Sequence, residues 1–266
     1  KIKFLSLASG SSGNCYYLGT EQYGILIDAG IGIRTIRKVL KEYGLSLSMI
    51  RAVLVTHDHA DHIKAVGNLG EKFGIPVYST PEIHVGINKS YCLTEKLSTS
   101  VRHLYKEIPI ELEDFKITAF EVPHDGTDNV GYCIEADGKV FTFLTDLGCI
   151  TPVAAQYICK AHYLIIEANY DEEMLKMGPY PAYLKERILG PNGHMCNKDT
   201  AEFLANNMHE NLKYIWLCHL SKDNNHPELA YKTVEWILRN KGICVGTDVQ
   251  LIALKRNTPT GMYEFE

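Results

Sequence analysis

The sequence predicts an α/β fold in which two β-sheets pack together and helices cover their outer faces. Three observations lead to this prediction. Short β-branched apolar runs of strand length recur along the chain, segments with apolar residues at helical spacing separate many of them, and the second half restarts the pattern of the first. No repeat, low-complexity tract or Pro/Gly/Ser-rich linker interrupts the chain, so residues 1–266 are expected to form a single domain.

The first half begins with strands and then alternates strands with helices. A helix is expected after residue 32, because Ile33, Ile36, Val39 and Leu40 follow helical spacing and Gly44 ends it. Another is expected to run from His62 towards residue 73, and a short one to begin at residue 81. Residues 101 to 145 are expected to form a meander. The expected strands are 2–7, 15–18, 25–27, 51–56, 76–79, 116–122, 130–135 and 140–144.

The second half repeats this alternation around one insertion. Helices are expected near 152–159, around Ala201, Leu204, Ala205 and Met208, and from Pro227. A mixed insertion covers 170–193. The expected strands are 163–166, 214–217, 243–245 and 249–254.

Composition excludes several classes of protein. The chain is 45% hydrophobic and 22% charged, as in ordinary globular proteins, and its net charge of −5 argues against a generally basic surface while leaving room for a local basic cleft. No apolar run approaches membrane-spanning length, and Lys1 to Phe4 lead straight into strand-like sequence, so neither a membrane partner nor a secretory leader is expected. The eight cysteines form no CxxC pair and most lie in apolar runs, which favours the cytoplasm. Nothing specifies the oligomeric state.

The densest polar stretch is VLVTHDHADHI, residues 53–63. A buried strand ends here, and His57 and His59 then point to one side with period two, while Asp61 and His62 turn into the next helix. The stretch could be a histidine-rich polar turn. Metal ions explain it better, because neutral imidazole and carboxylate are the usual ligands of zinc and related metals.

Four more polar residues each end a buried apolar strand. Any one of them could be a solvated loop residue, but all are candidates for completing a metal site. They are Asp28, His124, Asp146 and His219.

In this order, these residues and the HxHxDH stretch closely resemble the metallo-β-lactamase superfamily. The resemblance implies a four-layer αββα sandwich with two divalent ions at one sheet edge. It implies that His57, His59 and His124 hold one ion, that Asp61, His62 and His219 hold the other, that Asp146 bridges them, and that Asp28 orients the ligands.

The chemistry of such a site follows from its two ions. Cations about 3.5–4 Å apart can hold a bridging hydroxide as nucleophile and stabilise charge on substrate oxygens. Zinc is the expected metal. The carboxylates of Asp61, which is also expected to be catalytic, and Asp146 favour manganese as an alternative at the second position, and iron is a further candidate.

A further pair points to the reaction. Glu167 ends a strand and His194 follows Gly193, which resembles the glutamate and Gly-His motif of the tRNA-maturing endonucleases (RNase Z), where such a pair protonates the leaving oxygen. A carboxylate that orients an imidazole provides a general acid near neutral pH. The alternative is that Glu167 is a plain charge at a strand end and that His194 merely neighbours a helix cap.

Substrate contacts are expected at two places. The hairpin SGSSGN, with Ser11, Ser12 and Asn14, could present N–H groups to a phosphate or be an ordinary turn. In the insertion, Lys185 and Arg187 could pair with phosphates, or the segment could be a plain amphipathic helix.

Together, SGSSGN, THDHADH, EANYD and NGHMCN resemble the YycJ/WalJ branch, bacterial proteins regarded as DNA exonucleases. The sequence therefore predicts a dinuclear phosphodiesterase that acts on nucleic acid, most simply a DNA exonuclease. Two alternatives stay open: a small-molecule hydrolase of cyclic phosphodiesters or thioesters, and a metal-bound regulatory protein without turnover.

Overall fold

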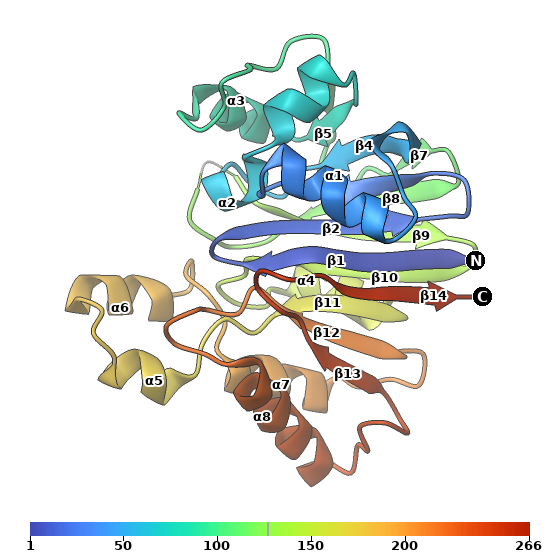
Figure 1. The fold of residues 1–266 in the computed structure, drawn as a ribbon. Coiled ribbons are helices and arrows are strands. Elements are labelled where there is room, and N and C mark those ends of the chain that lie inside the picture. The colour runs from blue at the N-terminus through green and yellow to red at the C-terminus, as the bar shows by residue number, and fades with distance from the viewer. Residues whose placement is uncertain (127) are drawn as a thin grey trace. The chain divides into compact units, whose positions relative to one another are not determined.

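The computed structural model describes residues 1–126 and 128–266 (Figure 1). The chain forms two compact units. Unit 1 comprises Lys1–Ile108, Gly126–Asn129 and Lys255–Glu266, and unit 2 comprises Pro109–Asp125 and Val130–Leu254. Within the described residues, no helix is both long and apolar enough to cross a membrane.

Unit 1 is built on a seven-stranded mixed sheet in the order β14-β1-β2-β3-β4-β5-β6. Its strands are β1 Ile2–Gly10, β2 Gly13–Gly19, β3 Gly24–Ile27, β4 Ile50–Leu54, β5 Val77–Ser79, β6 Val101–His103 and β14 Thr260–Phe265. Its helices are α1 Ile33–Glu42, α2 Ala60–Ile63 and α3 Pro81–Lys89, with a 3-10 turn η1 Leu47–Met49 and a π-helical turn η2 Asn68–Lys72. Strands β3 to β6 run parallel, and β14, β1, β2 and β3 pair antiparallel.

Unit 2 repeats this plan with the order β13-β12-β11-β10-β9-β8-β7. Its strands are β7 Ile110–Leu112, β8 Phe115–Glu121, β9 Val130–Ala136, β10 Lys139–Leu144, β11 Tyr163–Glu167, β12 Tyr214–Cys218 and β13 Gln250–Ala253. Its helices are α4 Pro152–Cys159, α5 Glu172–Met177, α6 Ala182–Leu189, α7 Asn197–Asn206 and α8 Pro227–Asn240. Strands β10 to β13 are parallel and β7 to β10 antiparallel, so both sheets join a meander to a parallel half.

Local sequence explains where several helices begin. The Thr80 hydroxyl accepts a hydrogen bond from the N–H of Ile83 at 3.2 Å, and Thr151 does the same for Ala154 at 3.2 Å. In both helices a proline occupies the first turn, where its missing N–H costs nothing. These caps fix where the chain turns from β5 into α3 and from the loop after β10 into α4.

The candidate site residues lie at or just after the ends of parallel strands. Asp28 follows β3, the histidine-rich turn follows β4, Asp146 follows β10, Glu167 ends β11 and His219 follows β12. Loops at the carboxyl ends of neighbouring parallel strands meet at one sheet edge, which is where α/β proteins bind ligands.

The structure differs from the predicted elements in three places. The helix after His62 is interrupted, because α2 ends at Ile63 and residues 64–65 form a turn before helical structure resumes at Val66 and leads into the π-helical turn at Asn68. Residues 243–245 form no strand, only an isolated bridge between Val245 and Val249. Strand β14 was not predicted, and it pairs antiparallel with β1 from the other end of the chain.

Candidate metal centre and general-acid pair

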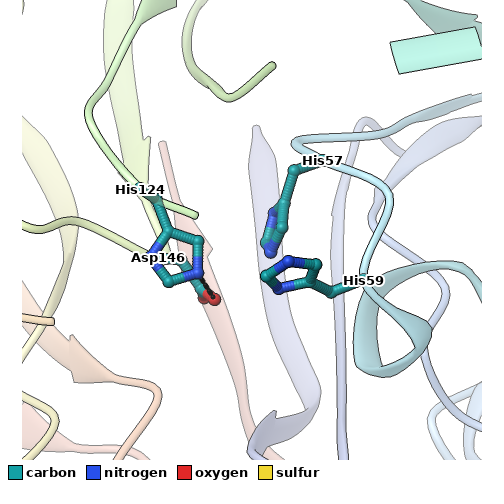
Figure 2. A group of neighbouring side chains, drawn as sticks. All are labelled: His57, His59, His124 and Asp146. Carbon is teal, nitrogen blue, oxygen red and sulfur yellow. Dashed lines mark ion pairs between the residues drawn. The ribbon is translucent and has the colours of Figure 1, made fainter. Parts of the chain in front are cut away.

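Unit 1 gathers the histidine-rich turn after β4 into one cluster. The ring centroids of His57 and His59 lie 4.6 Å apart, and those of His57 and His62 lie 4.0 Å apart. Figure 2 shows His57 and His59 close together on this turn. Ligand atoms of His57 and His59, and those of Asp61 and His62, lie within 4.8 Å of each other. Each of these two pairs is therefore close enough to bind a common ion.

Asp28 orients this cluster through hydrogen bonds to Thr56 and His62. Its carboxylate is fully buried and accepts hydrogen bonds from His62 Nδ1 at 2.6 Å, from the Thr56 N–H at 2.8 Å and from the Thr56 hydroxyl at 2.8 Å. Burial raises the pKa of Asp28 above its usual value, although His62 and Thr56 both act to lower it. Because Nδ1 of His62 donates to Asp28, its Nε2 carries the lone pair that a metal requires.

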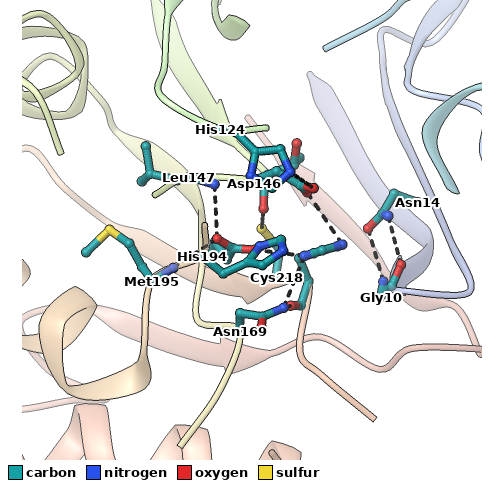
Figure 3. A network of polar contacts seen from close by, with 12 residues as sticks. Gly10, Asn14, His124, Asp146, Leu147, Asn169, His194, Met195 and Cys218 are labelled. Atoms are coloured by element: carbon teal, nitrogen blue, oxygen red, sulfur yellow. Dashed lines mark hydrogen bonds and ion pairs between the residues drawn. The ribbon is translucent and has the colours of Figure 1, made fainter. Parts of the chain in front are cut away.

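The SGSSGN hairpin supports the same cluster through Asn14. The Asn14 side chain exchanges hydrogen bonds with the backbone of Gly10 at 3.0 and 2.8 Å (Figure 3). Its Nδ2 also lies 3.3 Å from a carboxylate oxygen of Asp61. Ser11 and Ser12 form the exposed tip of the hairpin. Asn14 is thus buried against a candidate ligand, and only the two serines remain open to a substrate.

Backbone contact between two loops makes Gly30 a critical position. Its N–H donates to the Asn14 carbonyl at 2.9 Å, and a Cβ added to Gly30 would lie 1.6 Å from the carbonyl oxygen of Asp61. We expect Gly30→Ala to lower the free energy of unfolding by at least about 1–3 kcal/mol, the usual cost of overpacking. It should also reduce the bound metal, because Asp61 and His62 must move.

Gly32→Ala provides the matched control. No atom lies within 4 Å of a Cβ at Gly32, and the φ angle of this residue, −64°, suits alanine. Denaturant unfolding and elemental analysis of both variants test the prediction. Equal stability and equal metal content in the two variants would contradict it.

Unit 2 contributes three further candidate ligands. His124 Nε2 lies 3.2 Å from one Asp146 oxygen, and His219 Nε2 lies 3.5 Å from the other. The dashed line in Figure 2 marks the contact between His124 and Asp146. His124 Nδ1 donates to the Gly193 carbonyl at 2.8 Å. Asp146 is buried and adjoins two imidazoles.

The Glu167 carboxylate holds two of the candidate site residues of unit 2 in place. One carboxylate oxygen accepts from the backbone N–H groups of Leu147 at 3.0 Å and Met195 at 3.2 Å. The other accepts from Nδ1 of His194 and from Nδ1 of His219, both at 2.7 Å. Burial alone would raise the pKa of Glu167, but the two imidazoles outweigh it and hold that pKa below its usual value. A charged Glu167 therefore orients a candidate ligand and the candidate acid together.

The candidate acid His194 lies beside Glu167 and is partly exposed. Its Nδ1 is engaged by Glu167, so Nε2 is the atom left to carry a proton to a substrate. The side chain is one-fifth exposed, unlike buried Glu167, and its ring centroid lies 4.7 Å from that of His124. It is accessible to a substrate beside the candidate ligands of unit 2.

The insertion residues expected to contact substrate have partners within unit 2. Lys185 Nζ donates to the carbonyl of Lys176 at 2.7 Å, and Arg187 Nε pairs with an Asp125 carboxylate oxygen at 2.6 Å. Asp125 directly follows His124 in the chain. Through its ion pair with Asp125, Arg187 restrains the loop that carries His124.

The roles of two side chains could not be predicted from the sequence. Thr56 joins Asp28 to the histidine turn, and Asn169 holds the loop of His219 by donating to its carbonyl at 2.8 Å. In addition, Asp28 and His219 adopt left-handed φ angles of 60° and 55°, which non-glycine residues seldom do outside functional sites. The motif THD places Thr56 beside His57, but only the fold shows its partner.

The donor set fits divalent metal ions. Three histidines, His62, His124 and His219, each bond an acceptor through Nδ1, which leaves Nε2 as the ligand atom. Metal-binding histidines in proteins are oriented in this way.

Comparison with known proteins yields one family and several relatives. A family model described as "Beta-lactamase superfamily domain" matches residues 23–215. The exodeoxyribonuclease YycJ of Bacillus anthracis is 33% identical, over 97% of this chain and 97% of its own length. The exodeoxyribonuclease WalJ of Streptococcus pneumoniae is 36% identical, over 99% of this chain and 98% of its own length.

Solved structures agree on the fold. The zinc-bound PqqB from Methylobacterium extorquens matches with a TM-score of 0.72 at 15% identity, and the match covers 98% of this chain and 100% of that one. A likeness at this identity concerns the fold alone. It confirms the predicted fold class, with two mixed β-sheets and flanking helices.

Proposed function

Because the chain belongs to the metallo-β-lactamase superfamily, we propose that it is a dinuclear metal-dependent phosphodiesterase that degrades DNA from an end. Membership and the histidine and aspartate clusters make it a metal-dependent hydrolase. The choice of DNA is supported by the two relatives named exodeoxyribonucleases. One observation carries the reaction class: Glu167 holds His194 by Nδ1, and such a pair serves a leaving group that needs a proton.

Seven side chains would hold the two ions. We assign His57, His59 and His124 to one ion, and Asp61, His62 and His219 to the other, with Asp146 shared. We propose that residues 1–266 act as one catalytic domain. Zinc suits the imidazoles best, with manganese or iron as alternatives.

The proposed mechanism divides the work among these residues. When bound, the two ions would activate a water as nucleophile and neutralise charge on the phosphate oxygens. Asp61 and Asp146 offset the positive charge of the site. His194 donates the Nε2 proton to the departing oxygen. Glu167 accepts a hydrogen bond from Nδ1 and so stabilises the charged imidazole before the transfer.

The compartment we propose is the cytoplasm. All eight cysteines are free thiols, and four of them are buried. Thiols of this kind are kept reduced in the cytoplasm.

A substrate panel tests the function. The purified protein, loaded with zinc or manganese, is incubated with 5′- or 3′-end-labelled single- and double-stranded DNA, the matching RNAs, a small cyclic phosphodiester and a thioester. We expect DNA to be shortened progressively from one end. Rapid turnover of the cyclic phosphodiester or the thioester with intact DNA would replace this function by a small-molecule hydrolase, and no turnover of any substrate would favour a regulatory protein.

A further inference from the structure

Four basic side chains form a stripe along helix α1 of unit 1. Arg34, Arg37, Lys38 and Lys41 occupy positions i, i+3, i+4 and i+7, so they lie on one face of the helix, and all four are exposed. The opposite face buries Ile36, Val39 and Leu40. We call these four residues the α1 stripe (α1 is blue in Figure 1).

The charge of the α1 stripe is not neutralised. Over residues 1–126 and 128–266, none of its four side chains forms an ion pair with a carboxylate. Glu42 is the single acid in the helix. Some exposed cations elsewhere do have acidic partners: Lys176 pairs with Glu172 at 2.7 Å, for example. A protein of net charge −5 therefore keeps an unbalanced positive stripe at this place.

The stripe also borders a hollow of about 560 Å³. Its walls combine three of the cations with two hydroxyls, from Ser46 and Ser48, and with the exposed ring of Phe73. The guanidinium of Arg37 lies 5.6 Å from the centre of that ring. Cations and hydroxyls bind phosphate oxygens, and an exposed aromatic ring offers a stacking face to a base.

We propose that the α1 stripe and this hollow bind the phosphates of a nucleic-acid strand. The seven residue steps of the stripe span roughly 10 Å of helix, since each step rises about 1.5 Å. Successive phosphates of one strand are about 3.4 Å apart along a duplex axis, so the stripe matches roughly three of them. A polyanion with flat bases uses all three kinds of group present here, whereas an acidic protein would use the cations alone.

The stripe begins near the candidate metal ligands of unit 1. Helix α1 starts five residues after Asp28, and Gly30, between them, contacts the backbone of Asp61. A strand held on the α1 stripe would thus run close to the histidine turn. The choice of nucleic acid as occupant rests on the proposed function, while the charge and the geometry of the surface do not.

Salt-dependent binding tests the proposal. The variant Arg37→Gln/Lys38→Gln/Lys41→Gln removes three stripe charges, and the control Lys176→Gln/Lys198→Gln/Lys232→Gln removes three exposed charges that share a groove with acidic residues. Binding of a labelled 20-mer single strand is titrated at several salt concentrations, with metal-loaded protein. The stripe variant should show a log–log salt slope smaller by about 2, since each lost contact to a single strand lowers it by about 0.7. The control should keep the wild-type slope.

Thermal melting of both variants checks that they fold. Equal slopes for wild type, stripe variant and control would overturn the proposal. If the wild type cleaves DNA while the stripe variant binds it as well as the control does, the stripe inference fails and the proposed function stands. If the wild type binds DNA through the stripe but cleaves none, the stripe inference stands and the proposed function fails.

Discussion

Asp146→Ala is expected to remove bound metal and, with it, hydrolysis of every substrate. The Asp146 carboxylate lies 3.2 Å from His124 Nε2 and 3.5 Å from His219 Nε2, so its two oxygens adjoin both candidate imidazole ligands of unit 2. Loss of a residue that merely orients a ligand weakens metal binding by about 10–100-fold. A shared ligand should cost more than that.

Elemental analysis after gel filtration measures the effect. The wild type should retain about two ions per chain, as a dinuclear site requires. Asp137→Asn is the control, because it removes an exposed carboxylate of unit 2 at a left-handed position that asparagine tolerates. Full metal occupancy in Asp146→Ala would rule out the shared role.

His194→Ala is expected to slow cleavage of an unactivated phosphodiester by about 10²–10⁴-fold, the usual contribution of general acid catalysis. The bound metal should stay unchanged, because His194 is assigned to no ion. A substrate with a nitrophenolate leaving group needs little protonation, and its turnover should fall far less. The comparison of the two leaving groups separates proton donation from substrate binding.

The control for this variant is His103→Ala, which removes an exposed histidine of unit 1. Its rates on both substrates should equal those of the wild type. Losses of equal size on both leaving groups in His194→Ala would assign His194 to binding or to structure instead.

The histidine turn was readable from sequence because its chemistry is local. His57, His59, Asp61 and His62 lie within six positions after an apolar strand, so spacing alone predicts convergence. The distant candidate ligands could be predicted from their positions relative to the strands. His124, Asp146 and His219 each follow a strand, and the ends of strands meet at a sheet edge. Their assignment to particular ions stays a prediction.

Other features depend on contacts that no spacing reveals. Glu167 was expected to serve His194, but its bond to His219 joins residues 52 positions apart. Strand β14 is recognisable only through its partner β1, which lies at the opposite end of the chain. The helix after His62 looked continuous because its apolar spacing is helical. However, a Cβ at Gly67 would lie 2.3 Å from the backbone oxygen of Glu95, so this segment packs closely against the loop that contains Glu95.

Basic residues show the same limit. Lys185 and Arg187 stood out in sequence because they lie in an insertion with aromatic neighbours, yet their charged groups already have partners. The α1 stripe could not be singled out from the sequence, because lysine and arginine on an amphipathic helix usually mark a solvated face. Its significance depends on the absence of acidic partners, which only a fold can show.

The metal dependence of DNA cleavage tests the central claim most directly. Protein stripped of metal by a chelator is titrated with zinc or manganese, and the rate at which an end-labelled DNA strand is shortened is followed against metal bound per chain. We expect no cleavage by the stripped protein and full recovery at about two ions per chain, as a dinuclear site requires. Shortening of the DNA at an undiminished rate by protein shown to be free of metal would contradict the account.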